Sequence, residues 1–207
     1  MSKIKICGLF RSEDIEYVNE ARPDYVGFVF APGRRRIAPA QAAAFRKSLR
    51  PGIAPVGVFV NAPIDEIAAL YRDGVIHLAQ LHGGEDAAYI ERLKAACGVP
   101  IIKVVKIARH SRRSEESQPL TLCLADYLLF DSGNGSGKTF DWNLIPRTGK
   151  PYFLAGGIGL GNIGDALALS PYALDVSSGA ETNGLKDREK ILQLVAACRA
   201  GIDLLRN

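Results

Sequence analysis

Short apolar runs alternate with amphipathic stretches along the chain. In Lys3–Cys7, Ile4 and Ile6 face one side and the residues between them face the other, which predicts a first strand. Apolar residues at helical spacing follow over Ser12–Ala21, where two acidic residues directly after Ser12 favour a helix N-terminus. The same cycle then repeats, so we expect strands and helices in alternation.

The repeated cycle predicts seven further strands, at Asp24–Phe30, Ala54–Val60, Val75–His82, Pro100–Val105, Tyr127–Asp131, Tyr152–Ala155 and Tyr172–Val176. Further helices are expected at Pro39–Leu49, Pro63–Tyr71, Glu85–Ala96 and Asp187–Leu205. Two connections look shortened. Arg109–Pro119, after the fifth strand, is polar and poorly periodic, and Asp141–Pro146, after the sixth, leaves room for little more than a turn or two.

Such an alternation can form an open doubly wound sheet or a closed eight-stranded barrel. A dinucleotide-binding sheet would carry Gly-x-Gly-x-x-Gly after its first strand, and the residues after Cys7 do not match that motif. We therefore predict an α/β fold, a compact (β/α)8 barrel that forms a single domain over residues 1–207. With 207 residues the chain is short for this fold, in keeping with shortened connections after strands 5 and 6.

Composition and charge argue against several classes of partner. The formal net charge is +4, and its densest source is Arg34-Arg35-Arg36, which suits an anionic small molecule better than nucleic acid. No apolar signal segment and no bilayer-spanning run is found, so we expect no membrane partner. The four cysteines lie far apart and form no Cys-x-x-Cys pair, which indicates free thiols and a cytoplasmic protein.

Two loops of small residues follow the last two predicted strands. Gly156 and Gly157 come after the seventh strand, and Ser177, Ser178 and Gly179 come after the eighth. The backbone N–H groups of such loops can hold a phosphate, and in (β/α)8 barrels these two loops commonly do so. Either loop alone would also fit an ordinary strand-to-helix turn. Two such loops on consecutive strands favour a phosphate site.

Polar residues end several other strands, where barrels of this kind carry their reactive groups. Cys7 ends the first strand and Asp131 ends the sixth, and strand parity points both into the mouth. Gln80 and His82 end the fourth strand, and Asp175 lies within the eighth. Each has a structural explanation on its own, since a lone cysteine is usually a small buried apolar residue. Taken together, they indicate an active site.

Two charged features complete the predicted mouth. Lys5 shares a face with Cys7, and an ammonium inside a barrel needs a carboxylate, for which Asp175 is a candidate. The arginine run follows the second strand and would stand over the mouth, where a guanidinium suits an anionic substrate. A solvated loop is the usual structural explanation of such a run.

Short motifs occur in a fixed order along the chain, namely Lys5–Gly8, Val26–Phe30, Val56–Asn61, Gln80–Gly83, Gly135–Trp142, Leu154–Ile158 and Asp175–Glu181. This ordered set resembles the phosphoribosylanthranilate isomerase family from end to end of the chain. The resemblance implies an Amadori rearrangement in tryptophan biosynthesis, which converts N-(5-phosphoribosyl)anthranilate to 1-(2-carboxyphenylamino)-1-deoxyribulose 5-phosphate. It implies no cofactor and no metal, and it leaves a homodimer and a monomer both open.

The resemblance also implies roles for individual residues. The aspartate matching Asp131 is the general acid and the cysteine matching Cys7 the general base, so Asp131 must be protonated and Cys7 deprotonated when substrate binds. We expect Lys5 and the arginine run to lower the pKa of Cys7. Arg35 matches the family arginine expected to hold the anthranilate carboxylate or assist the acid, and Arg36 is the second choice. Substrate contacts are also expected at Gln80, His82 and Asp175.

Two other functions compete with this interpretation. The histidine-pathway isomerase performs the same rearrangement on a barrel with two aspartates, and a cysteine at the base position argues against it. A non-catalytic barrel that binds a phosphate ligand would not need Cys7 and Asp131.

Overall fold

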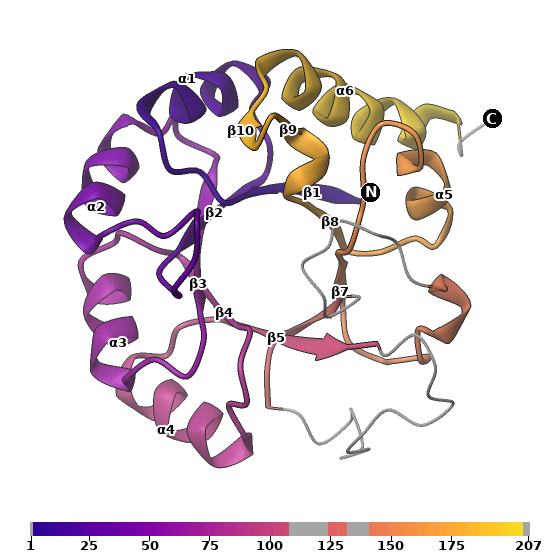
Figure 1. The fold of residues 1–207 in the computed structure, drawn as a ribbon. Helices are drawn as coiled ribbons and strands as arrows, with labels where there is room; N and C mark the ends of the chain where they lie inside the picture. Colours follow the sequence, from indigo (N-terminus) through magenta and orange to yellow (C-terminus); the bar gives the residue numbers. More distant parts are fainter. Residues whose placement is uncertain (1, 108–123, 132–140, 205–207) are drawn as a thin grey trace.

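Eight parallel strands form a closed barrel, as predicted (Figure 1). The computed structural model describes residues 2–107, 124–131 and 141–204. The strands pair in chain order and β8 returns to pair with β1, which closes the barrel. They are β1 (Lys3–Cys7), β2 (Tyr25–Val29), β3 (Ala54–Phe59), β4 (Leu78–Leu81), β5 (Ile101–Lys106), β6 (Tyr127–Asp131), β7 (Tyr152–Leu154) and β8 (Ala173–Val176).

Helices surround the barrel (Figure 1). They are α1 (Ser12–Ala21), α2 (Pro39–Ser48), α3 (Ile64–Arg72), α4 (Ala87–Cys97), α5 (Ile163–Ala168) and α6 (Arg188–Leu204). The short 3-10 helices η2 (Trp142–Leu144) and η3 (Ser178–Ala180) follow β6 and β8, and a hairpin of β9 (Glu181–Thr182) and β10 (Leu185–Lys186) precedes α6. The short connection predicted at Asp141–Pro146 contains η2, whereas the one predicted at Arg109–Pro119 lies outside the described residues.

The fourth strand is shorter than predicted. Its expected start at Val75 is wrong, because the backbone N–H groups of Val75 and Ile76 donate to Leu70 O, at 2.9 and 3.3 Å, and so complete the turn that ends α3. Both side chains are nevertheless buried. In the sequence, buried apolar residues in the turn after a helix therefore resemble the beginning of the next strand.

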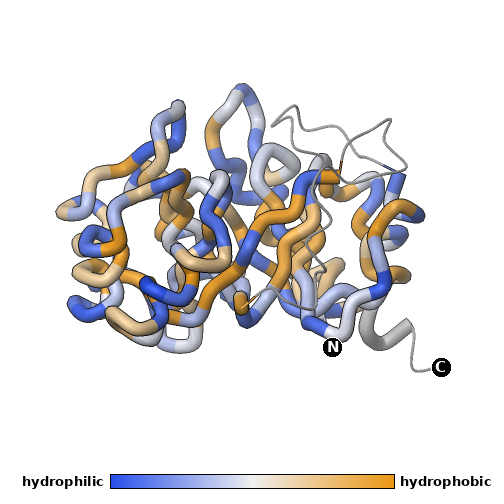
Figure 2. Tube along the Cα trace, turned by 90° about the horizontal axis from the view of Figure 1, so that it is seen from below, coloured by the Kyte–Doolittle hydropathy of each residue, from blue (hydrophilic) through white to orange (hydrophobic). Residues whose placement is uncertain are grey.

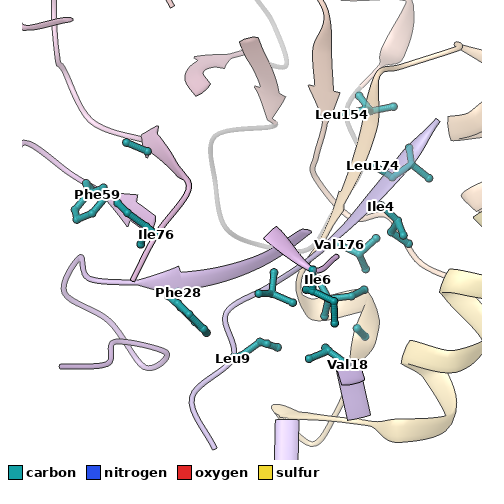
Figure 3. Close-up of a cluster of buried hydrophobic side chains, with 14 of the residues drawn as sticks. Ile4, Ile6, Leu9, Val18, Phe28, Phe59, Ile76, Leu154, Leu174 and Val176 are labelled. Atoms are coloured by element: carbon teal, nitrogen blue, oxygen red, sulfur yellow. The ribbon is translucent and has the colours of Figure 1, made fainter. Parts of the chain in front are cut away.

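Two apolar layers hold the fold together. The outer layer lies between the strands and the helices, and Figure 3 shows part of it, a cluster that includes Ile4 and Ile6 of β1, Val176 of β8 and Val18 of α1. In Figure 2 the strands carry long hydrophobic stretches, while the helices alternate hydrophobic and hydrophilic residues. The described part of the chain contains no helix long and apolar enough to cross a membrane.

The inner layer fills the barrel from the end where the strands begin. Phe153 is fully buried there, with its ring edge-on to those of Tyr25 and Tyr127 at centroid distances of 5.5 and 5.7 Å. Aromatic rings are thus packed across the inside of this end. The polar inner residues lie towards the opposite end, where the strands finish.

Candidate active site

The alternation along β1 and β8 sends polar side chains into the barrel. Ile4 and Ile6 belong to the outer apolar layer, so Lys5 and Cys7 face the interior. The same parity puts Asp175 of β8 on the inner face. Lys5 and Asp175 are also register partners in the pairing of β1 with β8.

Lys5 is fully buried and paired as expected. Its Nζ donates to both carboxylate oxygens of Asp175, each at 3.1 Å, and to Gln80 Oε1 at 2.6 Å. Burial acts to lower the pKa of Lys5, but Asp175 and Cys7 outweigh it, so this pKa lies above its usual value. Lys5 therefore carries a positive charge inside the barrel.

A second set of contacts runs from Gln80 to the predicted acid. Gln80 Nε2 lies 3.2 Å from His82 Nδ1, and His82 Nε2 lies 3.6 Å from Asp131 Oδ2. His82 follows β4, and its backbone N–H donates to Phe59 O at 2.8 Å, which continues the ladder between β3 and β4 by one bond. The structure thus brings together Gln80, His82 and Asp131.

Cys7 differs from expectation in its ionisation. Burial raises the pKa of Cys7, and Lys5 and Lys186, which lower it, do not compensate. Our expectation that nearby cations would leave this pKa below its ordinary value is therefore wrong. The thiol also packs tightly against Gly27 of β2, since a Cβ at that position would lie 2.5 Å from Cys7 Sγ.

The arginine run is held to the other end of the chain by Glu181. Arg35 donates from Nε and Nη2 to the two carboxylate oxygens of Glu181, at 2.7 and 2.8 Å, and Arg34 Nη2 donates to Oε2 at 2.9 Å. Lys186 Nζ adds a third cation at 2.7 Å. Although burial acts to raise it, hydrogen bonds from Arg35 and Lys186 lower the pKa of Glu181 to about 2. Three cations surround one carboxylate, which leaves an excess of positive charge.

The two candidate arginines are placed differently. Arg35 lies against Gly8, the residue after Cys7, so closely that a Cβ on Gly8 would collide with Arg35 Cδ. The Arg36 side chain is exposed, and its backbone forms an isolated bridge with Val29. Arg35 is therefore the arginine beside Cys7.

The two predicted phosphate loops meet each other. A Cβ on Gly179 would collide with Ile158 O, so only glycine permits this approach of the loop after β8 to the loop after β7. Gly156 and Gly157 have φ values of 89° and 68°. Ser177 joins this region to β1, because its Oγ donates to Cys7 O at 3.3 Å and its carbonyl accepts from Lys186 Nζ at 2.9 Å. Ser178 is the first residue of η3.

Three residues around the mouth were missed at the sequence level. Glu181 and Lys186 belong to the hairpin of β9 and β10, whose Asn183-Gly184 turn has φ values of 51° and 80° and is a strong hairpin signal in the sequence. Lys106, the last residue of β5, is the register partner of Asp131 and follows Ile102 and Val104 on the inner face. Strand parity would have identified it.

Comparison with known proteins gives one consistent result. The family model for N-(5'phosphoribosyl)anthranilate (PRA) isomerase matches residues 4–197. An N-(5'-phosphoribosyl)anthranilate isomerase from Endomicrobium trichonymphae is 47% identical over 206 residues, which cover 97% of this chain and 100% of that protein.

Solved structures agree with the sequence relatives. The structure of monomers of the dimeric enzyme of this name from Thermotoga maritima has a TM-score of 0.81 and 31% identity, and covers 97% of this chain and 100% of its own. Another enzyme of this name, in complex with reduced 1-(o-carboxyphenylamino)-1-deoxyribulose 5-phosphate, has a TM-score of 0.79 and 28% identity at the same coverage. With a match along nearly its whole length and a shared barrel, the chain belongs to the phosphoribosylanthranilate isomerase family.

Proposed function

We propose that this chain is an aldose-ketose isomerase that converts N-(5-phosphoribosyl)anthranilate to 1-(2-carboxyphenylamino)-1-deoxyribulose 5-phosphate by an Amadori rearrangement in tryptophan biosynthesis. Family membership supports this reaction. The observation that carries it in the structure is the placement of Cys7 and Asp131 at the C-terminal ends of β1 and β6, on the face that lines the barrel.

Asp131 is the proposed general acid and Cys7 the proposed general base. The Asp131 carboxyl group gives its proton to the ribose ring oxygen, the bond from that oxygen to C1′ breaks, and the nitrogen lone pair forms an iminium at C1′. The Cys7 thiolate then takes the C2′ proton, and the electrons of that bond form the C1′–C2′ double bond as the iminium is neutralised. The resulting enolamine tautomerises to the ketone, with no need for a metal or a cofactor.

The charges around the mouth suit the two anionic ends of this substrate. Arg35 lies beside Gly8 in a cluster with more positive than negative charge, which supports its proposed contact with the anthranilate carboxylate, with Arg36 as second choice. The loops that contain Gly156, Gly157 and Ser177–Gly179 are proposed to hold the phosphate. Their close approach and glycine conformations support this role. His82 and Asp175 are proposed to complete substrate binding.

The raised pKa of Cys7 adds a pH dependence to the proposal. A base whose pKa lies above its ordinary value is mostly a thiol at neutral pH, and the thiolate fraction grows as the pH rises. We therefore expect kcat/KM to increase with pH on the alkaline side, until Asp131 or another group needed in its protonated form limits it.

The test follows the loss of anthranilate fluorescence on freshly prepared phosphoribosylanthranilate, with wild type, Cys7→Ser and Asp131→Asn. Each variant should lose about two to four orders of magnitude in kcat, the usual contribution of an acid or base. Cys97→Ser and Asp65→Asn, on α4 and α3, are matched controls that should retain wild-type rates. A wild-type protein that binds the substrate without turnover would instead support the non-catalytic barrel.

Two further expectations belong to the proposal. A cytoplasmic location is supported by the free thiols at Cys7, Cys97 and Cys198, as expected in a reducing compartment. A homodimer and a monomer are both compatible with relatives, since the Thermotoga maritima enzyme is described as dimeric and has been obtained as monomers. Sedimentation of the purified protein across a concentration series distinguishes the two states.

A further inference from the structure

We propose that Gln80 is a positioning residue that holds His82 as the neutral imidazole with its hydrogen on Nε2, directed at Asp131. This inference rests on the proposed function, because it assigns Gln80 and His82 a part in the acid step. It moves Gln80 from the substrate-binding group to the interior of the protein. The structural basis is a chain of polar contacts from Lys5 through Gln80 and His82 to Asp131.

The orientation of the Gln80 amide is set by Lys5. An ammonium group has only donors, so the amide atom 2.6 Å from Lys5 Nζ has to be the oxygen, Oε1. The amide nitrogen Nε2 then has to face His82. Gln80 is 2% exposed, so solvent does not compete for either end of the amide. Both ends are occupied by protein, which argues against a direct contact with substrate.

The amide in turn sets the tautomer of His82. Nε2 of Gln80 is a donor only, and it lies 3.2 Å from His82 Nδ1, so Nδ1 has to be the acceptor. A neutral imidazole that accepts at Nδ1 carries its hydrogen on Nε2. The other neutral tautomer would place its N–H at Nδ1, directly against the amide N–H. The contacts therefore favour the tautomer with its hydrogen on Nε2.

This tautomer suits the chemistry assigned to Asp131. His82 Nε2 lies 3.6 Å from Asp131 Oδ2, and an Nε2–H donor there stabilises the negative charge that grows on the carboxyl group as it releases its proton. A positively charged imidazolium at the same distance would favour the carboxylate before the reaction begins, and Asp131 would then have no proton to give. A neutral donor assists the proton transfer without placing a positive charge beside the acid.

Gln80→Glu tests the assignment with almost no change in size. A carboxylate only accepts hydrogen bonds, so it can still accept from Lys5 but would require a hydrogen on His82 Nδ1. Nitrogen NMR of protein labelled in its histidines reports which ring nitrogen carries hydrogen, and His82→Asn identifies the signals of His82. We expect unprotonated Nδ1 and protonated Nε2 in the wild type, and protonated Nδ1 in Gln80→Glu. This measurement does not depend on turnover.

The kinetic arm uses Gln80→Glu, Gln80→Met and the matched control Gln193→Glu on the exposed face of α6. In both Gln80 variants the His82 Nε2–H donor is no longer held towards the charge that develops on Asp131. We therefore expect kcat to fall about 10- to 100-fold, the usual effect of losing a hydrogen bond to a charged group, and KM to change by less than about threefold. Gln193→Glu should match the wild type. Gln80→Met retains the test if Gln80→Glu does not fold.

The outcomes separate this inference from the proposed function. Protonated Nδ1 in the wild type overturns the inference whatever the activity, and so does an unchanged wild-type kcat in a folded Gln80 variant. A rise in KM with unchanged kcat would return Gln80 to substrate binding and also overturns it. Absence of turnover in the wild type counts against the proposed function alone, because the tautomer of His82 is measured directly.

Discussion

Replacement of Lys5 by methionine should cost this protein a large part of its stability. Lys5 is fully buried, with 0% of its surface exposed, and its partner Asp175 is 8% exposed. The substitution keeps most of the side-chain volume but leaves the Asp175 carboxylate inside the barrel without the ammonium that donates to both of its oxygens. Gln80 Oε1 loses its 2.6 Å hydrogen bond as well.

The expected size follows from these contacts. Loss of one partner of a buried ion pair typically costs about 3–5 kcal/mol, because the other charge remains buried and uncompensated. For a protein of this size, about 2–4 °C of Tm is lost for each kcal/mol, so the Tm should fall by about 6–20 °C. The pKa of Lys5 is raised in the folded state, so its contribution is fully present below the ordinary lysine pKa and is lost only as pH rises through the folded value. Measurements at pH 7 therefore record all of it.

Urea unfolding followed by circular dichroism gives the free energy of unfolding of each variant. The double variant Lys5→Met/Asp175→Leu is the matched control, since it removes both charges and should recover most of the loss. A loss below about 1 kcal/mol in Lys5→Met would contradict the reasoning, because such values are typical of exposed pairs. A double variant as unstable as the sum of the two single variants would show that the charges act independently.

Two further predictions concern residues around the mouth. In the folded protein the pKa of Glu181 is lowered from its ordinary value of 4.5 to about 2. Its ionised form therefore stabilises the fold at pH values above about 4.5, and this contribution is lost as the pH falls towards about 2. Glu181→Gln should therefore lower the free energy of unfolding by an amount on the order of 3 kcal/mol at pH 7, and the difference from wild type in acid unfolding curves should shrink below pH ~4.5. A constant difference down to pH ~2 would contradict this origin. Gly27→Ala should displace the Cys7 thiol, since the new Cβ would lie 2.5 Å from Sγ, and kcat should fall by about tenfold or more for a shift of about 1 Å. Steady-state kinetics measures this effect, and a folded variant with wild-type rates would refute the displacement.

The sequence predicted those parts of the fold in which local pattern and tertiary structure agree. The strands Lys3–Cys7 and Tyr127–Asp131 have their predicted bounds, because alternation and burial coincide along them. The fourth strand was predicted too long, since Val75 and Ile76 are apolar for the end of α3 rather than for the sheet. The sequence thus shows that a residue is buried more readily than it shows whether that residue belongs to a strand or to the end of a helix.

The candidate site was predictable where one strand fixes the direction of a side chain. Parity placed Lys5 and Cys7 on the inner face, and opposite charge suggested Asp175 as the partner of Lys5. Glu181 was not recognised, because its role depends on a hairpin that folds back to the loop after β2, almost 150 residues earlier in the chain. The direction in which the pKa of Cys7 is shifted could not be predicted either, since it depends on how strongly burial opposes the nearby cations.

The closure of the barrel between β1 and β8 has a consequence for the order in which the protein folds. The hydrogen bonds between Lys5 and Asp175 join residues 170 positions apart, so this contact is among the most non-local in the fold. During synthesis β1 emerges first, yet its ammonium has no carboxylate partner until β8 has also left the ribosome. The environment of Cys7 is therefore completed late, and a truncated chain without β8 should expose the unpaired edge of β1 and tend to aggregate.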